Sequence, residues 1–211
     1  MRHMNAPISN IRRGRKFDQV LEGAREVFLR DGFEGASVDE IARVSGVSKA
    51  TLYSYFSDKR LLFMEVAICE CDRMATETLV LVNQAGPVRE ALLIAAEKLT
   101  RFLISDFAQG VFRICVAERD RFPELGQAFY QAGPRMGRDR ICLFLQEAAA
   151  QQVLFIDDFH MAAEQLAELC KADLWNKAAF GIQTQFSDAE VQRVVVNAVD
   201  TFLARYGTPA R

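Results

Sequence analysis

The sequence contains no long hydrophobic run, few histidines and no paired cysteine motif. No apolar stretch approaches the ~20 residues that span a bilayer, and residues 1–15 lack the apolar centre of a signal peptide. We therefore expect no membrane segment and a cytoplasmic location. The five cysteines are scattered without a Cys-x-x-Cys motif, and the only histidines are His3 and His160. This composition argues against a zinc site or a disulfide framework, and free cysteines suit a reducing compartment.

The sequence also lacks the motifs of the common enzyme classes. No glycine-rich phosphate loop follows a strand-like segment, and no serine, histidine and aspartate stand in a plausible catalytic context. We therefore predict that the protein is not an enzyme, and that it has no catalytic residues, no metal ligands and no cofactor.

Helical periodicity is present along nearly the whole chain. Half of the 211 residues are hydrophobic, and they recur every three or four positions without strand-like alternation. This pattern predicts an all-α fold of about nine helices. Gly32 is suited to end the first helix in a left-handed conformation, and Asp58 is suited to cap the fourth. The expected helices cover 16–31, two short segments before Tyr55, Lys59 to about Leu81, and about 88–107, 109–119, 123–151, 157–180 and 187–206.

Positive charge is concentrated at the start of the chain. Residues 1–60 carry 11 lysines and arginines against 8 acidic residues, whereas the remainder carries 15 against 20. Four of the basic residues lie within five positions, and such a cluster attracts polyanions such as nucleic acid. We expect residues 1–15 to form a flexible basic arm, with a merely solvated tail as the alternative. The clustered residues are Arg12, Arg13, Arg15 and Lys16.

Residues 37–59 contain the signals of two short helices joined by a tight turn. Ser37 followed by Glu40 is a capping-box pattern that opens one helix. Gly46 provides the flexible backbone of the turn, and Ser48 is suited to cap the next helix. This layout is typical of a helix-turn-helix, whose second helix enters the DNA major groove. A tight helical corner that makes no DNA contact is the alternative.

The second of these short helices has one apolar side and one small, polar side. Leu52 and Phe56 share the apolar side, which we expect to pack against the core. Small residues on the other side let the backbone approach base edges, and tyrosine hydroxyls and lysines beside them suit phosphate oxygens. The small residues are Ala50, Thr51 and Ser54, and the residues beside them are Tyr53, Tyr55, Lys49 and Lys59.

This segment resembles the N-terminal motif of the TetR family of transcriptional regulators. The resemblance covers about residues 16–63 and is carried by the combination of positions. It departs from the family pattern at Ala36, where threonine is common, and at Asp58, where serine often caps the fourth helix. The matching positions are Gly32-Phe33, Ser37-Val38, Ile41-Ala42, Gly46-Val47-Ser48, Leu52-Tyr53, Tyr55-Phe56, Asp58-Lys59 and Leu62.

The resemblance implies a domain organisation and a set of DNA contacts. It implies that 16–63 forms a three-helix helix-turn-helix DNA-binding domain and that 64–211 forms a larger helical ligand-binding and dimerisation domain. The residues that it implies on the DNA are Ser37, Lys49, Ala50, Thr51, Tyr53, Ser54 and Lys59, with Ala50, Thr51 and Ser54 nearest the bases. To these we add Tyr55 and the basic residues Arg12, Arg13 and Arg15.

A second, less specific resemblance lies in the larger domain. Pro123-Glu124-Leu125, Ala128-Phe129-Tyr130 and Gly133-Pro134 resemble an efflux-regulator branch of the same family, which implies a helical domain for an unidentified small-molecule effector. Large side chains at helical spacing are candidates to wall its cavity, although such residues often form core instead. The candidates are Phe102, Phe107, Phe112, Cys115, Phe129, Tyr130, Met136, Phe144 and Trp175.

The last two expected helices suggest a dimer. An apolar stripe runs along the final helix from Val191 to Tyr206. In the helix before it, Leu166 and Trp175 lie on opposite sides, and a helix with two apolar faces packs against two neighbours. One neighbour is a second subunit in our interpretation, and burial within one larger core is the alternative. The family resemblance also implies a homodimer, here through about 159–180 and 188–206.

These observations together predict a ligand-responsive homodimeric transcriptional repressor that a small-molecule effector releases from DNA. Two recognition helices related by a two-fold axis would read a pseudo-palindromic operator with half-sites about 34–36 Å apart. Two alternatives stay open. One is a transcriptional activator of the same fold, and the other is a helical interaction protein whose helix-turn-helix no longer reads DNA.

Overall fold

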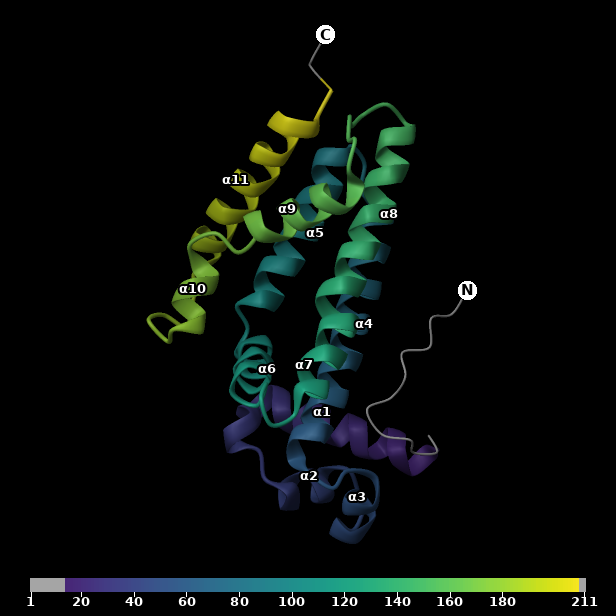
Figure 1. Ribbon diagram of the computed structural model, residues 1–211, viewed down its shortest axis with the longest axis vertical. Helices are drawn as coiled ribbons and strands as arrows, with labels where there is room; N and C mark the ends of the chain where they lie inside the picture. The colour runs from purple at the N-terminus through teal and green to yellow at the C-terminus, as the bar shows by residue number, and fades with distance from the viewer. Residues whose placement is uncertain (1–13, 209–211) are drawn as a thin grey trace. The chain divides into compact units, whose positions relative to one another are not determined.

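The computed structural model describes residues 14–208, which form helices joined by short connections (Figure 1). The predicted all-α fold is confirmed, because the described residues contain only one isolated bridge, between Leu154 and Gly207, and no strand. They divide into two compact units. The first unit extends to Cys71 and includes Asp106–Gly133, and the second unit consists of Asp72–Ser105 and the chain from Pro134 onward.

Aromatic side chains dominate the core of the first unit. Phe17, Phe28 and Phe63 are fully buried, and Phe28 and Phe63 meet edge to face with 4.8 Å between ring centroids. Gly32, with a φ of 69°, interrupts the first helix at the predicted place. The helices of this unit are α1 (Arg15–Gly35), α2 (Val38–Val44), α3 (Lys49–Tyr55), the first part of α4 (Lys59–Gln84), α6 (Asp106–Ala117) and α7 (Pro123–Tyr130).

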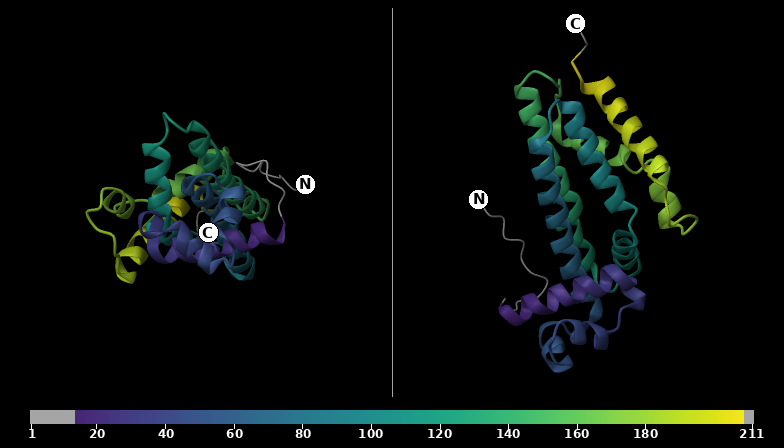
Figure 2. Two further views of the ribbon diagram at one scale, coloured as in Figure 1. Left: turned by 90° about the horizontal axis from the view of Figure 1, so that it is seen from below. Right: turned by 180° about the vertical axis from the view of Figure 1, so that it is seen from behind.

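The second unit has a separate core, to which α11 contributes several residues. Val195, Val199 and Phe202 of α11 are buried, and α11 lies along α5, as Figure 1 and the right-hand view of Figure 2 show. The helices of this unit are the rest of α4, α5 (Val88–Leu103), α8 (Met136–Ala150), α9 (Phe159–Leu169), α10 (Leu174–Ala179) and α11 (Asp188–Tyr206). The π-helical turn η1 (Gln131–Arg135) leads from α7 into α8.

Two of the expected long helices are divided. The segment 123–151 becomes α7, η1 and α8, because Pro134 cannot donate a backbone hydrogen bond within a regular helix. The segment 157–180 becomes α9 and α10, with Asp173 at a φ of 64° between them. Trp175 therefore does not share a continuous helix with Leu166, and the inference that one helix has two apolar faces was wrong.

The apolar stripe of α11 is buried within its own unit. Val191, Val194 and Ala198 pack in the same core as the buried residues of α5 and α9. At the start of this helix, Ser187 and Glu190 form a complete capping box. The stripe that suggested a dimer contact is thus covered by the chain itself, as the alternative interpretation expected.

Candidate nucleic-acid interface and apolar cavity

Serine caps begin both short helices of the helix-turn-helix. The Ser37 hydroxyl accepts a hydrogen bond from the Glu40 amide at 3.1 Å, and Ser48 accepts one from the Thr51 amide at 3.1 Å. Gly46 adopts a φ of 63° in the turn between them, a conformation that glycine tolerates best. Asp58 accepts from the Arg60 amide at 2.7 Å at the start of α4. The predicted caps and turn are therefore confirmed.

The two sides of α3 differ as the sequence indicated. Leu52 and the following Phe56 are buried, and the Phe56 ring stacks on Phe17 with 5.5 Å between centroids. The opposite side is open, and Tyr53 has 51% of its surface exposed. Lys49, Ala50, Tyr53 and Ser54 are exposed, and Thr51 is half-buried. The helix thus exposes small and hydroxyl-bearing side chains on one side, while Leu52 and Phe56 hold its other side against the core.

Tyr55 and Lys59 lie in settings that the sequence did not indicate. The Tyr55 ring packs edge-on against Phe17 at 5.6 Å and is half-buried, so it belongs partly to the core. The Lys59 ammonium donates to the carbonyls of Phe33 at 2.8 Å and Ala36 at 3.0 Å. It also lies 4.3 Å from the centre of the Phe33 ring. Lys59 therefore connects the start of α4 by hydrogen bonds to the segment where α1 ends and α2 follows.

The remaining predicted DNA residues come from several parts of the chain. Ser37 is exposed, and Lys49 forms an ion pair with Asp39 of α2. Arg15 is exposed at the first residue of α1. Arg12 and Arg13 lie outside the described residues.

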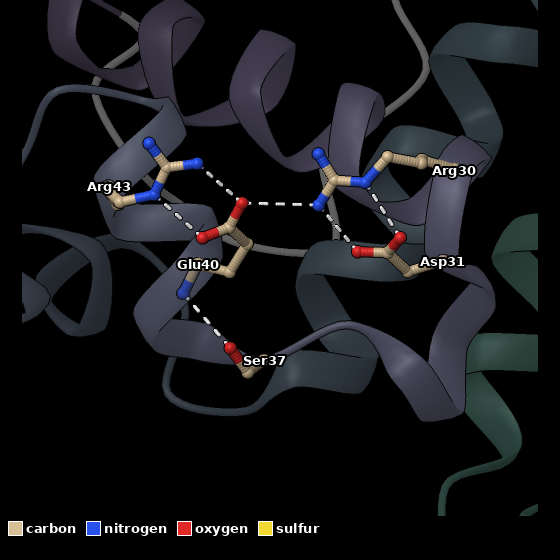
Figure 3. A network of polar contacts seen from close by, with 5 residues as sticks. All are labelled: Arg30, Asp31, Ser37, Glu40 and Arg43. Atoms are coloured by element: carbon tan, nitrogen blue, oxygen red, sulfur yellow. Dashed lines mark hydrogen bonds and ion pairs between the residues drawn. The ribbon is translucent and has the colours of Figure 1, made fainter.

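A charged network that the sequence analysis missed joins the end of α1 to α2 (Figure 3). Arg43 donates to the two oxygens of Glu40 at 2.8 and 2.7 Å, and Arg30 donates to Glu40 at 3.2 Å. Arg30 also holds Asp31 through contacts of 2.8 and 2.7 Å. These bonds, from Arg43 foremost, lower the pKa of Glu40 to about 2.

Only half of the predicted capping box at Ser37 is therefore formed. The Glu40 amide binds Ser37, but the Glu40 carboxylate binds the two arginines instead of the backbone at Ser37. Arg43, three residues after Glu40, was the sequence signal for this outcome, because residues three apart are neighbours on a helix. Arg30 comes from another helix and gave no such signal.

The second unit contains an apolar cavity of about 100 Å³. Its walls come from α4, α5, α8 and α9, and small residues such as Ala75, Ala96 and Gly137 leave the space open. Leu79 at its rim is 43% exposed. The lining residues are Met74, Ala75, Thr78, Leu79, Val82, Leu92, Ala95, Ala96, Leu99, Gly137, Arg140, Ile141, Phe144, Leu166 and Cys170.

Phe144 alone among the predicted ligand residues lines this cavity. Phe102, Met136 and Trp175 belong to the same unit but not to the cavity wall. The other five belong to the first unit. They are Phe107, Phe112, Cys115, Phe129 and Tyr130.

The predicted ligand residues of the first unit have other surroundings. Phe107 is buried against Phe63 at 5.1 Å. Burial raises the pKa of Cys115 to about 11, so this thiol is not activated. The cavity of the second unit follows instead the spacing of small and aliphatic residues along α5 and α8.

The described residues contain no cluster of histidine, cysteine and acidic side chains that could hold a metal ion. None of the helices within residues 14–208 combines the length and hydropathy that a bilayer crossing requires.

Two family descriptions match the chain. Residues 20–66 match the bacterial regulatory proteins of the tetR family, and residues 90–208 match the C-terminal domain of AefR-like transcriptional repressors. The second match alone covers more than half of the chain. The chain belongs to the TetR family of transcriptional regulators, as the sequence motif indicated, and it is a regulator rather than an enzyme.

Similarity to two individual relatives covers less than half of this chain in each case. The chain is 37% identical over 68 residues to the transcriptional repressor AcnR of Corynebacterium diphtheriae, which is 32% of this chain and 36% of the relative. It is 34% identical over 88 residues to the transcriptional activator FasR of Mycolicibacterium smegmatis, which is 42% of this chain and 40% of the relative. These matches therefore span well under half of each relative.

Solved structures match over nearly the whole chain. A TetR-family regulator from Mesorhizobium loti has a TM-score of 0.79 at 28% identity, over 94% of this chain and 100% of that one. The flavonoid-responsive regulator FrrA has a TM-score of 0.63 at 32% identity, with the same two coverages.

Proposed function

We propose that this protein is a homodimeric transcriptional repressor that binds a pseudo-palindromic operator and is released by a small-molecule effector. The observation that carries the proposal is the open side of α3, where Ala50, Tyr53 and Ser54 are exposed and Thr51 is half-buried, while Leu52 of the same helix is buried in the core. Small side chains of this kind fit the major groove, and a thymine methyl can contact a threonine methyl or an alanine.

Regulation is proposed to act through residues 64–211, which contain the whole second unit. These residues supply the ligand-binding and dimerisation functions in this proposal, and the effector occupies the cavity lined by α4, α5, α8 and α9. An effector that binds more tightly to a conformation with the wrong spacing of recognition helices lowers DNA affinity by linkage, typically by about 1–3 kcal/mol. The name of the flavonoid-responsive relative FrrA supports a ligand response in this branch.

The first experiment is a mobility shift with footprinting on the intergenic DNA beside the protein's own gene, at two salt concentrations. We expect protection of a palindrome and a steep fall in affinity with salt, because each neutralised phosphate contributes about 0.9 to the logarithmic salt slope. Absence of specific protection with weak salt dependence would favour the helical interaction protein.

Two substitutions test the division of labour on α3. Tyr53→Phe removes a phosphate-directed hydroxyl and is expected to weaken binding to all DNA sequences about equally. Thr51→Ser removes only a methyl group and is expected to change which base is preferred in each half-site. Equal effects of both variants on every sequence would contradict the proposed roles.

A transcriptional activator is the second candidate, because FasR, which is 34% identical over 88 residues, is named an activator. In vitro transcription from the footprinted promoter distinguishes the two. Reduced transcript with added protein supports repression, and increased transcript supports activation.

A further inference from the structure

The lining of the cavity in the second unit follows α5 and α8 over a similar length of helix. On α8 it is lined by Gly137, Arg140, Ile141 and Phe144, and the same spacing recurs on α5, so each stripe covers about 10 Å of helix. A short alkyl chain laid along these stripes matches their length. A fused ring system is not enclosed there, because the volume of about 100 Å³ is smaller than the engineered cavity of about 150 Å³ that holds one benzene molecule.

The lining offers a ligand little polarity. Thr78 carries the only hydroxyl group among the described lining residues, and this hydroxyl donates to the Met74 carbonyl at 2.7 Å within α4. Of the described residues that line the cavity, Arg140 is the only charged one. An apolar ligand body therefore matches the walls, and a single negative charge matches the one cation.

The present partner of Arg140 is exchangeable. Its guanidinium donates to the Asp72 carboxylate at 2.7 Å and to the Thr76 hydroxyl at 3.4 Å. Asp72 is 66% exposed, and exposed ion pairs contribute little to stability. A ligand carboxylate in its place keeps a charge-assisted hydrogen bond to Arg140 and adds burial of an apolar tail.

We propose that the effector is a slender monocarboxylate whose alkyl tail fills this cavity and whose carboxylate binds Arg140. The regulatory meaning of the site rests on the proposed function, whereas the binding itself does not. Gly137 is assigned as a specificity-determining residue, since a Cβ there would meet no heavy atom within 4 Å. A longer side chain at position 137 can therefore extend into open space at the wall of the cavity.

The test is calorimetric titration of the full chain with hexanoate and with hexan-1-ol, which has the same tail without the charge. We expect saturable hexanoate binding that is about tenfold or more stronger than hexanol binding, as a charge-assisted hydrogen bond provides. Arg140→Gln should bring hexanoate down to the affinity of hexanol. Gly137→Leu should abolish the binding of both.

Two control variants have matched chemistry away from the cavity. Arg89→Gln removes an exposed arginine that pairs with Asp200 at 2.8 Å, and it should leave hexanoate binding unchanged. Gly126→Leu fills similarly open space on α7 and should also leave it unchanged. Circular dichroism of each variant verifies that it is folded.

Three outcomes overturn the assignment: hexanoate does not bind, hexanoate binds no better than hexanol, or Arg140→Gln binds both ligands as the wild type does. Binding of a flavonoid such as naringenin that Gly137→Leu prevents, without hexanoate binding, would replace the alkyl chain with a ring system.

Operator binding, measured on the same proteins, separates this inference from the proposed function. Operator binding without any hexanoate binding rejects the assigned effector class alone. Hexanoate binding in the expected pattern without any operator rejects the repressor and leaves the binding site in place.

Discussion

Glu40 takes part in contacts that couple folding to pH. Arg43 and Arg30 bind its carboxylate and lower its pKa from 4.5 to about 2. Because the folded pKa lies below the unfolded one, the stabilisation is complete above about pH 4.5 and is lost as the pH falls toward 2. Its size is small, since exposed ion pairs contribute little.

Glu40→Gln is therefore expected to lower the free energy of unfolding slightly at pH 7 and to have a shrinking effect below about pH 4.5. Urea unfolding of both proteins between pH 7 and pH 3 measures this difference. Glu34→Gln, which changes an exposed acid on α1, is the control. A difference between wild type and Glu40→Gln that stays constant with pH would show that the ion pairs are not its source.

Lys59 is the residue whose role the structure changes most. Its ammonium donates to the backbone carbonyls of Phe33, near the end of α1, and of Ala36, directly after it. Loss of a charged donor typically costs about 1.5–3 kcal/mol. We expect Lys59→Met to lower the free energy of unfolding by that amount in chemical denaturation. Lys49→Met, which removes an exposed lysine, should change it by less than about 0.5 kcal/mol.

These two lysine variants also separate direct from indirect effects on DNA binding. Lys49→Met should weaken DNA binding while leaving the fold stable. A Lys59→Met protein that is as stable as the wild type but binds DNA weakly would indicate that Lys59 contacts a phosphate directly, as the family resemblance implies.

At the scale of elements, the crossing of α1 and α2 depends on one glycine. A Cβ on Gly23 would lie 2.2 Å from the Ser45 hydroxyl oxygen and 2.7 Å from the Ser45 amide nitrogen. No real side chain fits there, so the two helices approach closely only with glycine at this position. The distance between α1 and α2 therefore determines how closely the first helix of the helix-turn-helix packs against α1.

Gly23→Ala is expected to destabilise the protein by about 1–3 kcal/mol, the usual cost of overpacking a core. Gly126→Ala, with no heavy atom within 4 Å of the new Cβ, should instead stabilise it by about 0.5–1 kcal/mol through helix propensity. Thermal and urea unfolding of the pair tests both signs. A Gly23→Ala protein as stable as the wild type would mean that α1 and α2 separate at little cost.

At the scale of the whole molecule, the proposed dimer needs apolar side chains that the chain leaves uncovered. Phe180 and Ile182, between α10 and α11, are 78% and 74% exposed. They lie at the edge of the two segments that the family resemblance assigns to dimerisation. Large apolar residues exposed together are typical of an interface between proteins.

We expect the double substitution Phe180→Ser with Ile182→Ser to convert a dimer into a monomer at micromolar concentration, as measured by light scattering after size-exclusion chromatography. Leu143→Ser is the control, because Leu143 of α8 is also exposed but lies outside the proposed interface. A double variant that stays dimeric would exclude this pair from the interface.

Several features of the first unit could be predicted from the sequence, because they depend only on residues close together in the chain. Ser37, Gly46 and Ser48 act within four residues of their own positions, through caps and a turn that depend on residue type alone. Helical periodicity fixed the all-α fold and the inward side of α3 for the same reason. These features need no knowledge of distant neighbours.

Contacts between residues far apart in the sequence were decided only by the tertiary structure. Lys59 reaches Phe33 and Ala36, and Arg30 reaches Glu40, across separate helices. Which side chains wall a cavity depends on where packing is incomplete, so small and aliphatic residues line it while most of the large aromatic candidates lie elsewhere. The stripe of α11 was visible in the sequence, but the neighbour that it meets is its own core, because periodicity states that a face is buried and not what buries it.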